Sequence, residues 1–326
     1  MIRDLEIGET TYLVGVVKSL VEKTTKNGSP YVDIEFQDKS GSILAKAWDT
    51  KAEDLEKRNI RTGVLAYAKG TVGEFKGQAQ FTIDTNNGIN IANVADYKDL
   101  QNAYPLEDYL PTAPISYEEI KSYLLWAIGQ IEDEEIRSLM EEIFEEYGHR
   151  LISYPGSLNV HHEYINGLGY HIYRMMGQVF ALKEVYREGI NWDYLIAGVL
   201  IHDLGKVHCY VLSDLGMPEA YSLDNDLKGH LAIGYSMLEA YDISREKKDL
   251  LQHLILAHHG KREFGAVATP MTMEAHILHF IDNLDATVTM VEKELDKLDE
   301  EEVSGRIWYL DNTKLYKVPE EKDPVL

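Results

Sequence analysis

The first hundred residues alternate apolar and polar positions with the period of two that is typical of half-buried β-strands. In the segment 31–38, YVDIEFQD, the side chains of Val32, Ile34 and Phe36 fall on one face and the residues between them on the other. The Asn-Gly pair in KNGSP, residues 26–30, predicts a tight turn before this strand. The same alternation predicts strands at 10–24, 42–49, 64–75 and 78–94, with a short helix at 52–57.

Five strands with a helix between the third and the fourth resemble the OB-fold nucleic-acid-binding family. The resemblance covers about residues 8–95 and implies a barrel that holds single strands through aromatic rings stacked on bases and basic side chains near phosphates. Trp48 and Phe75, beside Lys46 and Lys76, are the candidates, because each lies in a polar or turn-like context. Most of the other rings in this segment are expected to pack the barrel core.

From residue 116 onward the apolar period becomes that of a helix, and Ser116 followed by Glu119 is typical of a capping box. Helices are predicted at 164–187, 192–202, 229–241, 245–258 and 273–298. Three prolines and few periodic apolar positions indicate a linker over 97–115. We therefore predict a multidomain chain, with an N-terminal all-β OB barrel in 1–96, this linker, an all-α domain in 116–302 and a C-terminal tail in 303–326.

The charge is distributed unevenly over the 326 residues. The net charge is −23, but residues 1–100 hold 13 Lys and Arg against 15 Asp and Glu, a balance of −2 that leaves −21 for the rest. A nearly neutral segment can present a basic groove to nucleic acid, whereas a strongly acidic one repels polyanions unless bound cations or local Lys and Arg offset its field. If the acidic part acts on nucleic acid, bound cations or local Lys and Arg must offset its negative charge.

No apolar run approaches the ~20 residues that span a bilayer, and the N-terminus, MIRDLEIGE, has no apolar signal core. The only cysteine, Cys209, cannot form an intramolecular disulfide, and its apolar neighbours favour a core position. We therefore expect a cytoplasmic protein without a membrane partner.

Histidine is concentrated in the helical part, where eleven of the twelve histidines lie between 161 and 279. Histidines interspersed with aspartates in one helical domain are what a polydentate metal site needs. His202 and Asp203 are neighbours at the end of the apolar run 194–201. Adjacent side chains on a helix diverge by about 100°, so the pair can share an ion only at a helix end or if the ion lies between the two side chains. Gly205 predicts that end.

Several phrases of the helical part, GLGYHIY, IHDLGK, LAHHG and HFIDNLDA, resemble the HD-domain metal-dependent phosphohydrolases. The residues that carry this resemblance are, in order, His171, His202, Asp203, His230, His258, His259 and Asp282. The phrases HHGKREFG and ILHFIDNLDATV, with a barrel in front of them, more narrowly resemble the YhaM subgroup of bacterial 3′-to-5′ exoribonucleases. That second resemblance extends over nearly the whole chain.

The resemblance implies two divalent ions, one held by His171, His202, Asp203 and Asp282, and one held by His230, His258 and His259. Asp203 would be shared between them as the bridge. Imidazoles and carboxylates suit Mn, Fe, Co, Ni or Zn, of which we expect Mn²⁺, and a dinuclear site can lower the pKa of a bridging water. His259 is the least expected ligand, because adjacent histidines on a helix rarely point at one site.

The resemblance further implies hydrolysis of single-stranded RNA, and of single-stranded DNA as a second candidate, from the 3′ end to nucleoside 5′-monophosphates. Lys206, one turn after Asp203, would stabilise the charge that develops on the phosphate. Lys261 and Arg262 either contact the substrate backbone or balance local charge. Asp285 is expected to orient a ligand imidazole. His161 and His162 are expected to be structural or to face the substrate.

Two other functions remain open on the sequence alone. One is an HD-domain phosphohydrolase of a nucleotide or cyclic dinucleotide, in which the barrel is regulatory. The other is a non-catalytic single-strand-binding protein whose metal is structural, although the full ligand set with Lys206 speaks against it. The sequence is compatible with a homo-oligomer and does not define one.

Overall fold

The structure, a computed structural model, describes residues 1–86, 88–158, 162–213 and 215–319. The contacts divide the chain into two units, of which the first comprises Met1–Thr112 together with Ser213–Gly216, and the second the rest. Each unit has its own hydrophobic core. The predicted fold class, an all-β part followed by a helical part, is confirmed.

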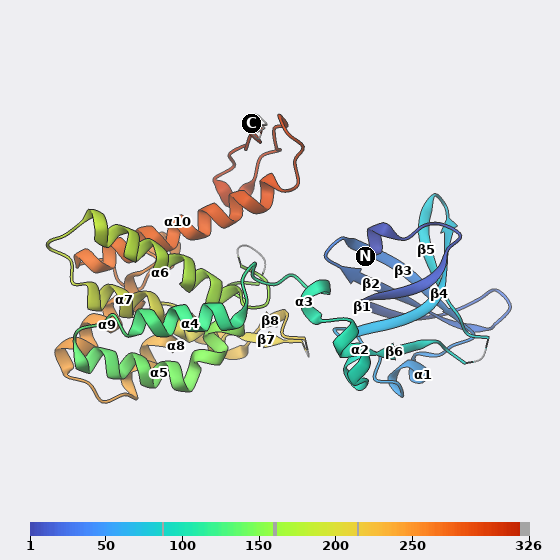
Figure 1. Ribbon diagram of the computed structural model, residues 1–326, viewed down its shortest axis with the longest axis horizontal. Coiled ribbons are helices and arrows are strands. Elements are labelled where there is room, and N and C mark those ends of the chain that lie inside the picture. Colours follow the sequence, from blue (N-terminus) through green and yellow to red (C-terminus); the bar gives the residue numbers. More distant parts are fainter. Residues whose placement is uncertain (87, 159–161, 214, 320–326) are drawn as a thin grey trace, which may run out of the picture. The chain divides into compact units, whose positions relative to one another are not determined.

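The first unit is a barrel whose strands pair in a closed ring (Figure 1). Its elements are β1 (Thr10–Thr24), β2 (Pro30–Asp38), β3 (Gly41–Trp48), α1 (Ala52–Glu56), β4 (Leu65–Phe75), β5 (Gln78–Ile83) and β6 (Ile91–Asn93). β1 pairs with both β2 and β4, β2 pairs with β3, β3 runs parallel to β5, and β5 pairs with β4. This is the strand order of the OB barrel that the sequence predicted.

The first half of β1 pairs with β4 and its second half pairs with β2. The β1–β2 register shifts between Val17 and Ser19, which marks a β-bulge. Such a bulge bends a strand and increases its twist, as closure of a small barrel requires. The predicted face of β2, with Val32, Ile34 and Phe36, is fully buried. Burying each such side chain stabilises the fold by about 1.5–3 kcal/mol, which fixes the register.

The fifth strand differs from its prediction, because the structure divides residues 78–94 into β5 and the short β6. The backbone turns at Asp84, whose side chain accepts hydrogen bonds from the backbone and side-chain nitrogens of Asn86. Asp and Asn stabilise turns through such local hydrogen bonds, which compete with the strand ladder. The segment after the barrel contains α2 (Lys98–Ala103) and α3 (Leu106–Tyr109).

The second unit consists mainly of helices packed around α7 (Figure 1). The helices are α4 (Tyr117–Ile128), α5 (Glu134–Ser153), α6 (Gly167–Val185), α7 (Trp192–Ile201), α8 (Leu223–Glu239), α9 (Arg245–Ala257) and α10 (Met273–Leu295). Every residue of α7 from Leu195 to Ile201 is buried. A helix that is apolar all round belongs in a core, and α7 packs against α5, α6, α9 and α10. The residues that follow α7 therefore emerge at the centre of the unit.

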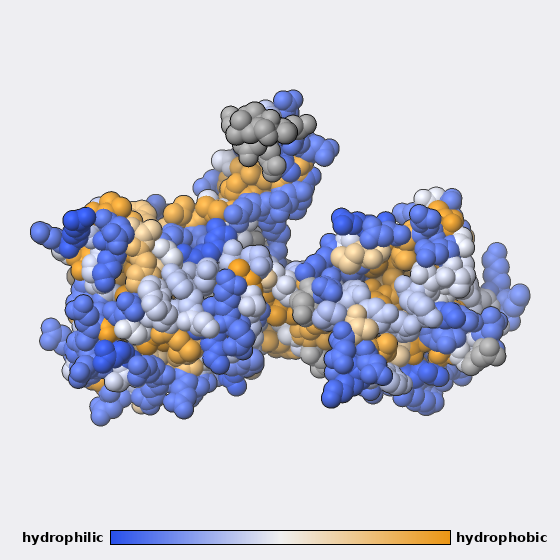
Figure 2. Space-filling model, viewed as in Figure 1, coloured by the Kyte–Doolittle hydropathy of each residue, from blue (hydrophilic) through white to orange (hydrophobic). Residues whose placement is uncertain are grey.

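The helical part also contains a small hairpin that the sequence did not predict. β7 (Tyr210–Leu212) pairs with β8 (Pro218–Tyr221) in the connection between α7 and α8. After α10, two isolated bridges, Val303 with Tyr316 and Ile307 with Thr313, fold the tail back on itself. Within the described residues, no helix is both long and apolar enough to cross a membrane. The face shown in Figure 2 is largely hydrophilic, with separate apolar patches.

Candidate metal centre and nucleic-acid-binding residues

The His202–Asp203 pair stands at the end of α7, as the sequence predicted. His202 is the last residue with helical backbone angles, and Asp203 has φ −104° and ψ 17°, so the chain leaves the helix there. The two side chains consequently converge, with His202 Nε2 3.2 Å from Asp203 Oδ2. A Cβ at Gly205 would lie 2.0 Å from the backbone oxygen of His230, so only glycine permits this close approach to α8.

A first cluster forms where α6 and α10 meet the end of α7. His171 Nε2, from α6, lies 3.3 Å from His202 Nε2 and 3.2 Å from Asp282 Oδ1, from α10. His171, His202 and Asp203 are buried, and each offers a ligand atom within 4.8 Å of the other two. Residues 111 positions apart in the sequence are thus brought to one point.

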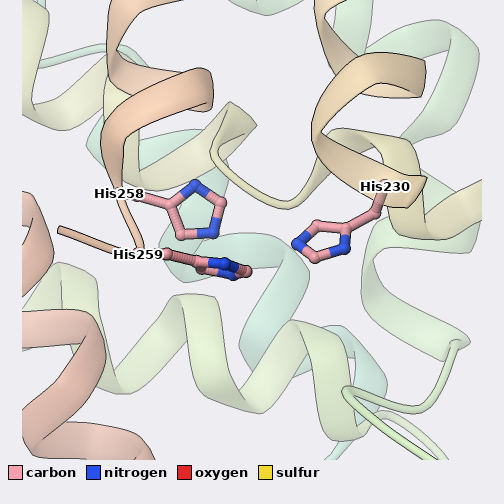
Figure 3. Close-up of side chains that lie close together, drawn as sticks. All are labelled: His230, His258 and His259. Carbon is pink, nitrogen blue, oxygen red and sulfur yellow. The ribbon is translucent and has the colours of Figure 1, made fainter. Parts of the chain in front are cut away.

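A second cluster consists of His230, His258 and His259, whose rings face one another in Figure 3. Gly229, with φ +73°, interrupts the helical backbone of α8 immediately before His230. His258 caps α9 and His259 follows it, so the adjacent histidines do not diverge as they would inside a helix. Their ring centroids are 4.4 Å apart, and that of His259 lies 5.1 Å from that of His230.

Asp203 lies between the two clusters. Its Oδ2 is the atom closest to His202, whereas its Oδ1 is 3.5 Å from His230 Nε2 and 3.8 Å from His258 Nε2. Each carboxylate oxygen therefore faces a different group of imidazoles. This is the arrangement that a carboxylate needs to bridge two ions.

The proton positions of three of these imidazoles follow from their hydrogen bonds. Nδ1 of His202 lies 2.9 Å from the backbone oxygen of Val199, and Nδ1 of His258 lies 2.8 Å from that of Ile255. Nδ1 of His171 lies 2.7 Å from Asp285 Oδ2. Because these oxygens accept hydrogen bonds, each Nδ1 carries a proton and donates, so Nε2 is the ring nitrogen left to bind a cation. Burial lowers the pKa of His171, but its hydrogen bonds to Asp282 and Asp285 outweigh burial and raise that pKa to about 9, so a cation at Nε2 of His171 displaces a proton.

Asp285 is the centre of a buried support behind His171. Its Oδ2 also accepts from His162 Nε2 at 2.7 Å, its Oδ1 lies 2.6 Å from Arg174 Nε, and Nδ1 of His162 lies 2.8 Å from the Tyr164 hydroxyl. Burial would raise the pKa of Asp285, but the hydrogen bonds from His162 and His171 hold it well below its usual range. Asp285 is therefore placed to orient the imidazole of His171, as the sequence predicted, and His162 is bonded to the same carboxylate oxygen. His161 lies outside the described residues.

The residues of both clusters fit a metal ion. Among the residues that the structure describes, Asp203 Oδ1, His230 Nε2 and His259 Nδ1 are buried without a hydrogen-bond partner. Buried polar atoms without partners are exceptional, and an ion is one explanation. Burial lowers the pKa of His230 to about 4 and that of His258 well below its usual value, so both are neutral ligands at neutral pH. Imidazole nitrogens with carboxylate oxygens suit divalent transition metals.

Lys206 reaches back to the centre from the turn after α7. Its Nζ lies 2.7 Å from Asp203 Oδ2 and donates to the backbone oxygen of Gly156 at 2.8 Å. Burial disfavours the charged amine, but Asp203 outweighs it and raises the pKa of Lys206, so the ammonium stays charged. The sequence predicted that Lys206 lies near the reacting phosphate, and the structure brings it to the carboxylate between the clusters.

A cleft of about 180 Å³ opens over the centre. It is lined by Asp203, Lys206, His258, His259, Phe264, His279, Asp282, Asn283 and Ala286. Sequence reasoning did not select Phe264 or Asn283, because neither carries a charge or is a typical metal ligand, although both lie in the phrases HHGKREFG and HFIDNLDA. The candidate Lys261 lies near this cleft, with its Nζ 5.2 Å from the ring of Phe264 and 3.4 Å from Glu263 Oε1. Arg262 is exposed and begins the 3₁₀ turn that contains Phe264.

The candidate aromatic residues of the barrel are on its surface. Trp48 is 37% exposed and packs on Tyr31 at 4.8 Å between ring centroids, and Lys46 Nζ lies over both rings while bonding to Asp33. Phe75, 57% exposed, lies at the turn between β4 and β5 with Lys76 Nζ 5.4 Å from its ring.

A further pair of stacked rings on the barrel, in which Tyr12 is exposed and Tyr67 half-buried, was not selected from the sequence. The rings of Tyr12 and Tyr67 stack at 5.1 Å, and Lys69 Nζ lies 5.8 Å from the Tyr12 ring. Strand alternation gave no reason to prefer these tyrosines over core rings. Their pairing depends on the β1–β4 register, in which Tyr12 is opposite Lys69.

Comparison with known proteins adds the following likenesses. Residues 168–287 match the family described as HD domain. Over 318 residues the chain is 33% identical to the 3'-5' exoribonuclease YhaM of Bacillus licheniformis, and the aligned part makes up 96% of each chain. It is 34% identical to the protein of that name from Geobacillus sp. (96% of this chain, 93% of the relative) and 32% identical to that of Bacillus subtilis (96% of each).

Among solved structures, the second OB-fold domain of replication protein A from Methanococcus maripaludis aligns with 28% of this chain and 91% of its own. The sequence identity is 19% and the TM-score is 0.22. The barrel assignment depends on the strand pairing described above.

Proposed function

Because the chain belongs to the YhaM family of 3′-5′ exoribonucleases, we propose that it hydrolyses single-stranded RNA from the 3′ end and releases nucleoside 5′-monophosphates. Single-stranded DNA is the second candidate substrate. The observation that carries this proposal is Asp203, which presents one carboxylate oxygen to each of two imidazole clusters. Two ions bridged in this way suit an in-line displacement at a phosphodiester.

In this proposal the activity depends on two divalent metal ions, which we propose to be Mn²⁺. One is held by His171, His202, Asp203 and Asp282, and the other by His230, His258 and His259, with Asp203 shared. Ions bound there would activate water and neutralise charge on the phosphate oxygens. Asp285 holds His171 in the tautomer that presents Nε2 to the ion.

Lys206 supplies positive charge that belongs to the protein itself. Its ammonium is held between Asp203 and the Gly156 carbonyl and lines the cleft over the centre. Charge that develops on the non-bridging phosphate oxygens during hydrolysis would be stabilised there without reorganisation of the side chain. Water adds to the phosphorus of the last phosphodiester and loses a proton. The bond between the phosphorus and the 3′ oxygen of the preceding nucleotide breaks, and that oxygen takes up a proton to become a 3′ hydroxyl.

The barrel, which we place in residues 1–96, is proposed to capture the single strand for the helical domain at 116–302. Trp48 and Phe75 offer exposed rings for stacking on bases, with Lys46 and Lys76 beside them. Lys261 and Arg262 are proposed contacts to the substrate backbone near the cleft. We further propose that the protein is cytoplasmic, has no membrane partner and can form a homo-oligomer.

The experiment that tests the proposed substrate class compares RNA with a small nucleotide. Mn²⁺-loaded protein is incubated with a 5′-labelled single-stranded RNA and, separately, with a cyclic dinucleotide. We expect a ladder of shortened RNAs with mononucleotide products and an intact cyclic dinucleotide. Consumption of the cyclic dinucleotide with no change in the RNA would contradict the proposal and favour a nucleotide phosphohydrolase.

Replacing both Trp48 and Phe75 by alanine should weaken the capture of long RNA. Base stacking on an aromatic ring contributes about 1–3 kcal/mol per base, so we expect KM for a long RNA to rise on the order of tenfold or more while kcat is unchanged. Steady-state kinetics on RNAs of increasing length measure this effect. The Tyr97→Ala variant is a matched control, because Tyr97 is also exposed in the first unit. An unchanged KM in the double variant would show that these two rings do not bind the RNA.

A further inference from the structure

A second cavity, of about 570 Å³, lies next to the cleft over the metal centre. The two hollows share Lys206, His259 and Ala286 in their walls, so they adjoin at the centre itself. The larger cavity is also lined by His230 and by Tyr210, Tyr221 and Tyr309. Its volume falls in the roughly 300–1,000 Å³ range of small-molecule sites, which suits a single nucleoside.

Two of these tyrosines form one wall. Tyr210 and Tyr221 are direct partners across the β7–β8 hairpin, and their rings stack with centroids 5.9 Å apart and an angle of 25° between their planes. Tyr221 is 44% exposed, whereas Tyr210 is less exposed and its pKa is raised by burial. Tyr221 is thus an accessible ring supported from one side by another ring.

Hydrogen bonds to Gly156 and to the turn after α7 hold this wall in position. Tyr210 donates its hydroxyl hydrogen bond to the Gly156 carbonyl at 3.0 Å, the same oxygen that accepts from Lys206. Ser222, directly after Tyr221, donates from Oγ to the backbone oxygen of His208 at 2.6 Å, and its backbone nitrogen bonds to Cys209. The hairpin therefore has a fixed position relative to Lys206 and the start of α8.

We propose that this cavity binds the base and sugar of the 3′-terminal nucleotide, with Tyr221 as the surface on which the base stacks. The 5′ phosphate of that nucleotide would then lie at the centre, beside Lys206. This inference rests on the proposed function, since it assigns the nucleoside whose phosphate is attacked. Stacking uses the π face that every base has, so the subsite accepts all four bases.

The test is an equilibrium binding experiment on the Mn²⁺-loaded full-length protein. Adenosine 5′-monophosphate and ribose 5-phosphate are titrated calorimetrically into wild type, Tyr221→Ala and Tyr221→Phe. Both ligands carry the phosphate, but only the first carries a base. We expect wild type and Tyr221→Phe to bind adenosine 5′-monophosphate on the order of tenfold more tightly than ribose 5-phosphate. In Tyr221→Ala this difference should disappear, with ribose 5-phosphate bound as in wild type.

A matched control is Tyr186→Ala, because Tyr186 is 54% exposed and lines a separate cavity that shares no residue with this one. It should bind both ligands as wild type does. Equal affinity of wild type for the two ligands would overturn the inference, and so would full discrimination in Tyr221→Ala. Circular dichroism and bound manganese report on folding, and Tyr221→Leu replaces the alanine variant if that one fails to fold.

The failure of this inference differs from failure of the proposed function. If the protein shortens RNA but binds the two ligands equally, only the nucleoside subsite is wrong. If it binds adenosine 5′-monophosphate through Tyr221 but leaves RNA intact, the subsite stands and the exoribonuclease activity does not.

Discussion

Replacing Asp203 by alanine should abolish RNA hydrolysis and lower the bound metal. The variant loses the carboxylate whose two oxygens face the two clusters, and it leaves Lys206 without its buried counter-charge. Loss of a residue that only supports a metal ligand typically costs 10–100-fold in affinity or activity, so loss of the bridge should cost more than about 100-fold. Elemental analysis of the purified variant and kcat/KM on a single-stranded RNA measure the two effects.

Two further variants distinguish the loss of the bridging carboxylate of Asp203 from the loss of any carboxylate. Asp249 is a surface carboxylate on α9 that pairs with Arg245, and Asp249→Ala should leave metal content and turnover unchanged. Asp285→Asn removes the charge behind His171 and should lower metal affinity by about 10–100-fold while some turnover remains at high metal. Full metal occupancy and wild-type turnover in Asp203→Ala would exclude Asp203 as a bridging ligand.

A stable stem upstream of a single-stranded 3′ end should stall the enzyme. The cleft over the centre has a volume of about 180 Å³, which does not admit a duplex, so the terminal nucleotide must first be unpaired. Extrusion of a paired base costs a few kcal/mol, and we therefore expect removal of nucleotides to slow by more than about tenfold at the stem. A gel time course on a 5′-labelled RNA with a 3′ overhang beyond a hairpin shows where shortening ends.

The control for this experiment is an RNA of the same composition with one side of the stem scrambled, which should be shortened without a pause. If the stem is degraded as fast as the scrambled sequence, the active site accepts duplex and the single-strand requirement is wrong.

The barrel could be predicted because the patterns that define its strands and turns lie within short stretches of the sequence. Alternation in 31–38, the Asn-Gly turn before it and the order of strands and helix are all contained in the sequence. The division of the last strand was missed because the hydrogen bonds of Asp84 with Asn86 compete with the strand pattern. The β7–β8 hairpin was missed because three or four residues per strand give too few positions to define a period.

The metal centre could be predicted only in part. The histidines and aspartates could be named from their motifs, and a helix end at His202 could be expected from Gly205. The sequence did not indicate that His259 would face His230, because this depends on α9 ending at Ala257. Nor did it reveal the partnership of His162 with Asp285, which joins residues 123 positions apart through tertiary packing alone.

The most direct test of hydrolysis from the 3′ end at this centre is a time course on one 5′-labelled RNA and its closed circular form, with Mn²⁺ and with a chelator. A cleft that admits one strand end should act on the linear RNA alone. We expect the linear RNA to shorten steadily from its 3′ end only with Mn²⁺, while the circle stays intact. Cleavage of the circle into internal fragments, or shortening of the linear RNA in the chelator, would contradict metal-dependent exonucleolytic hydrolysis.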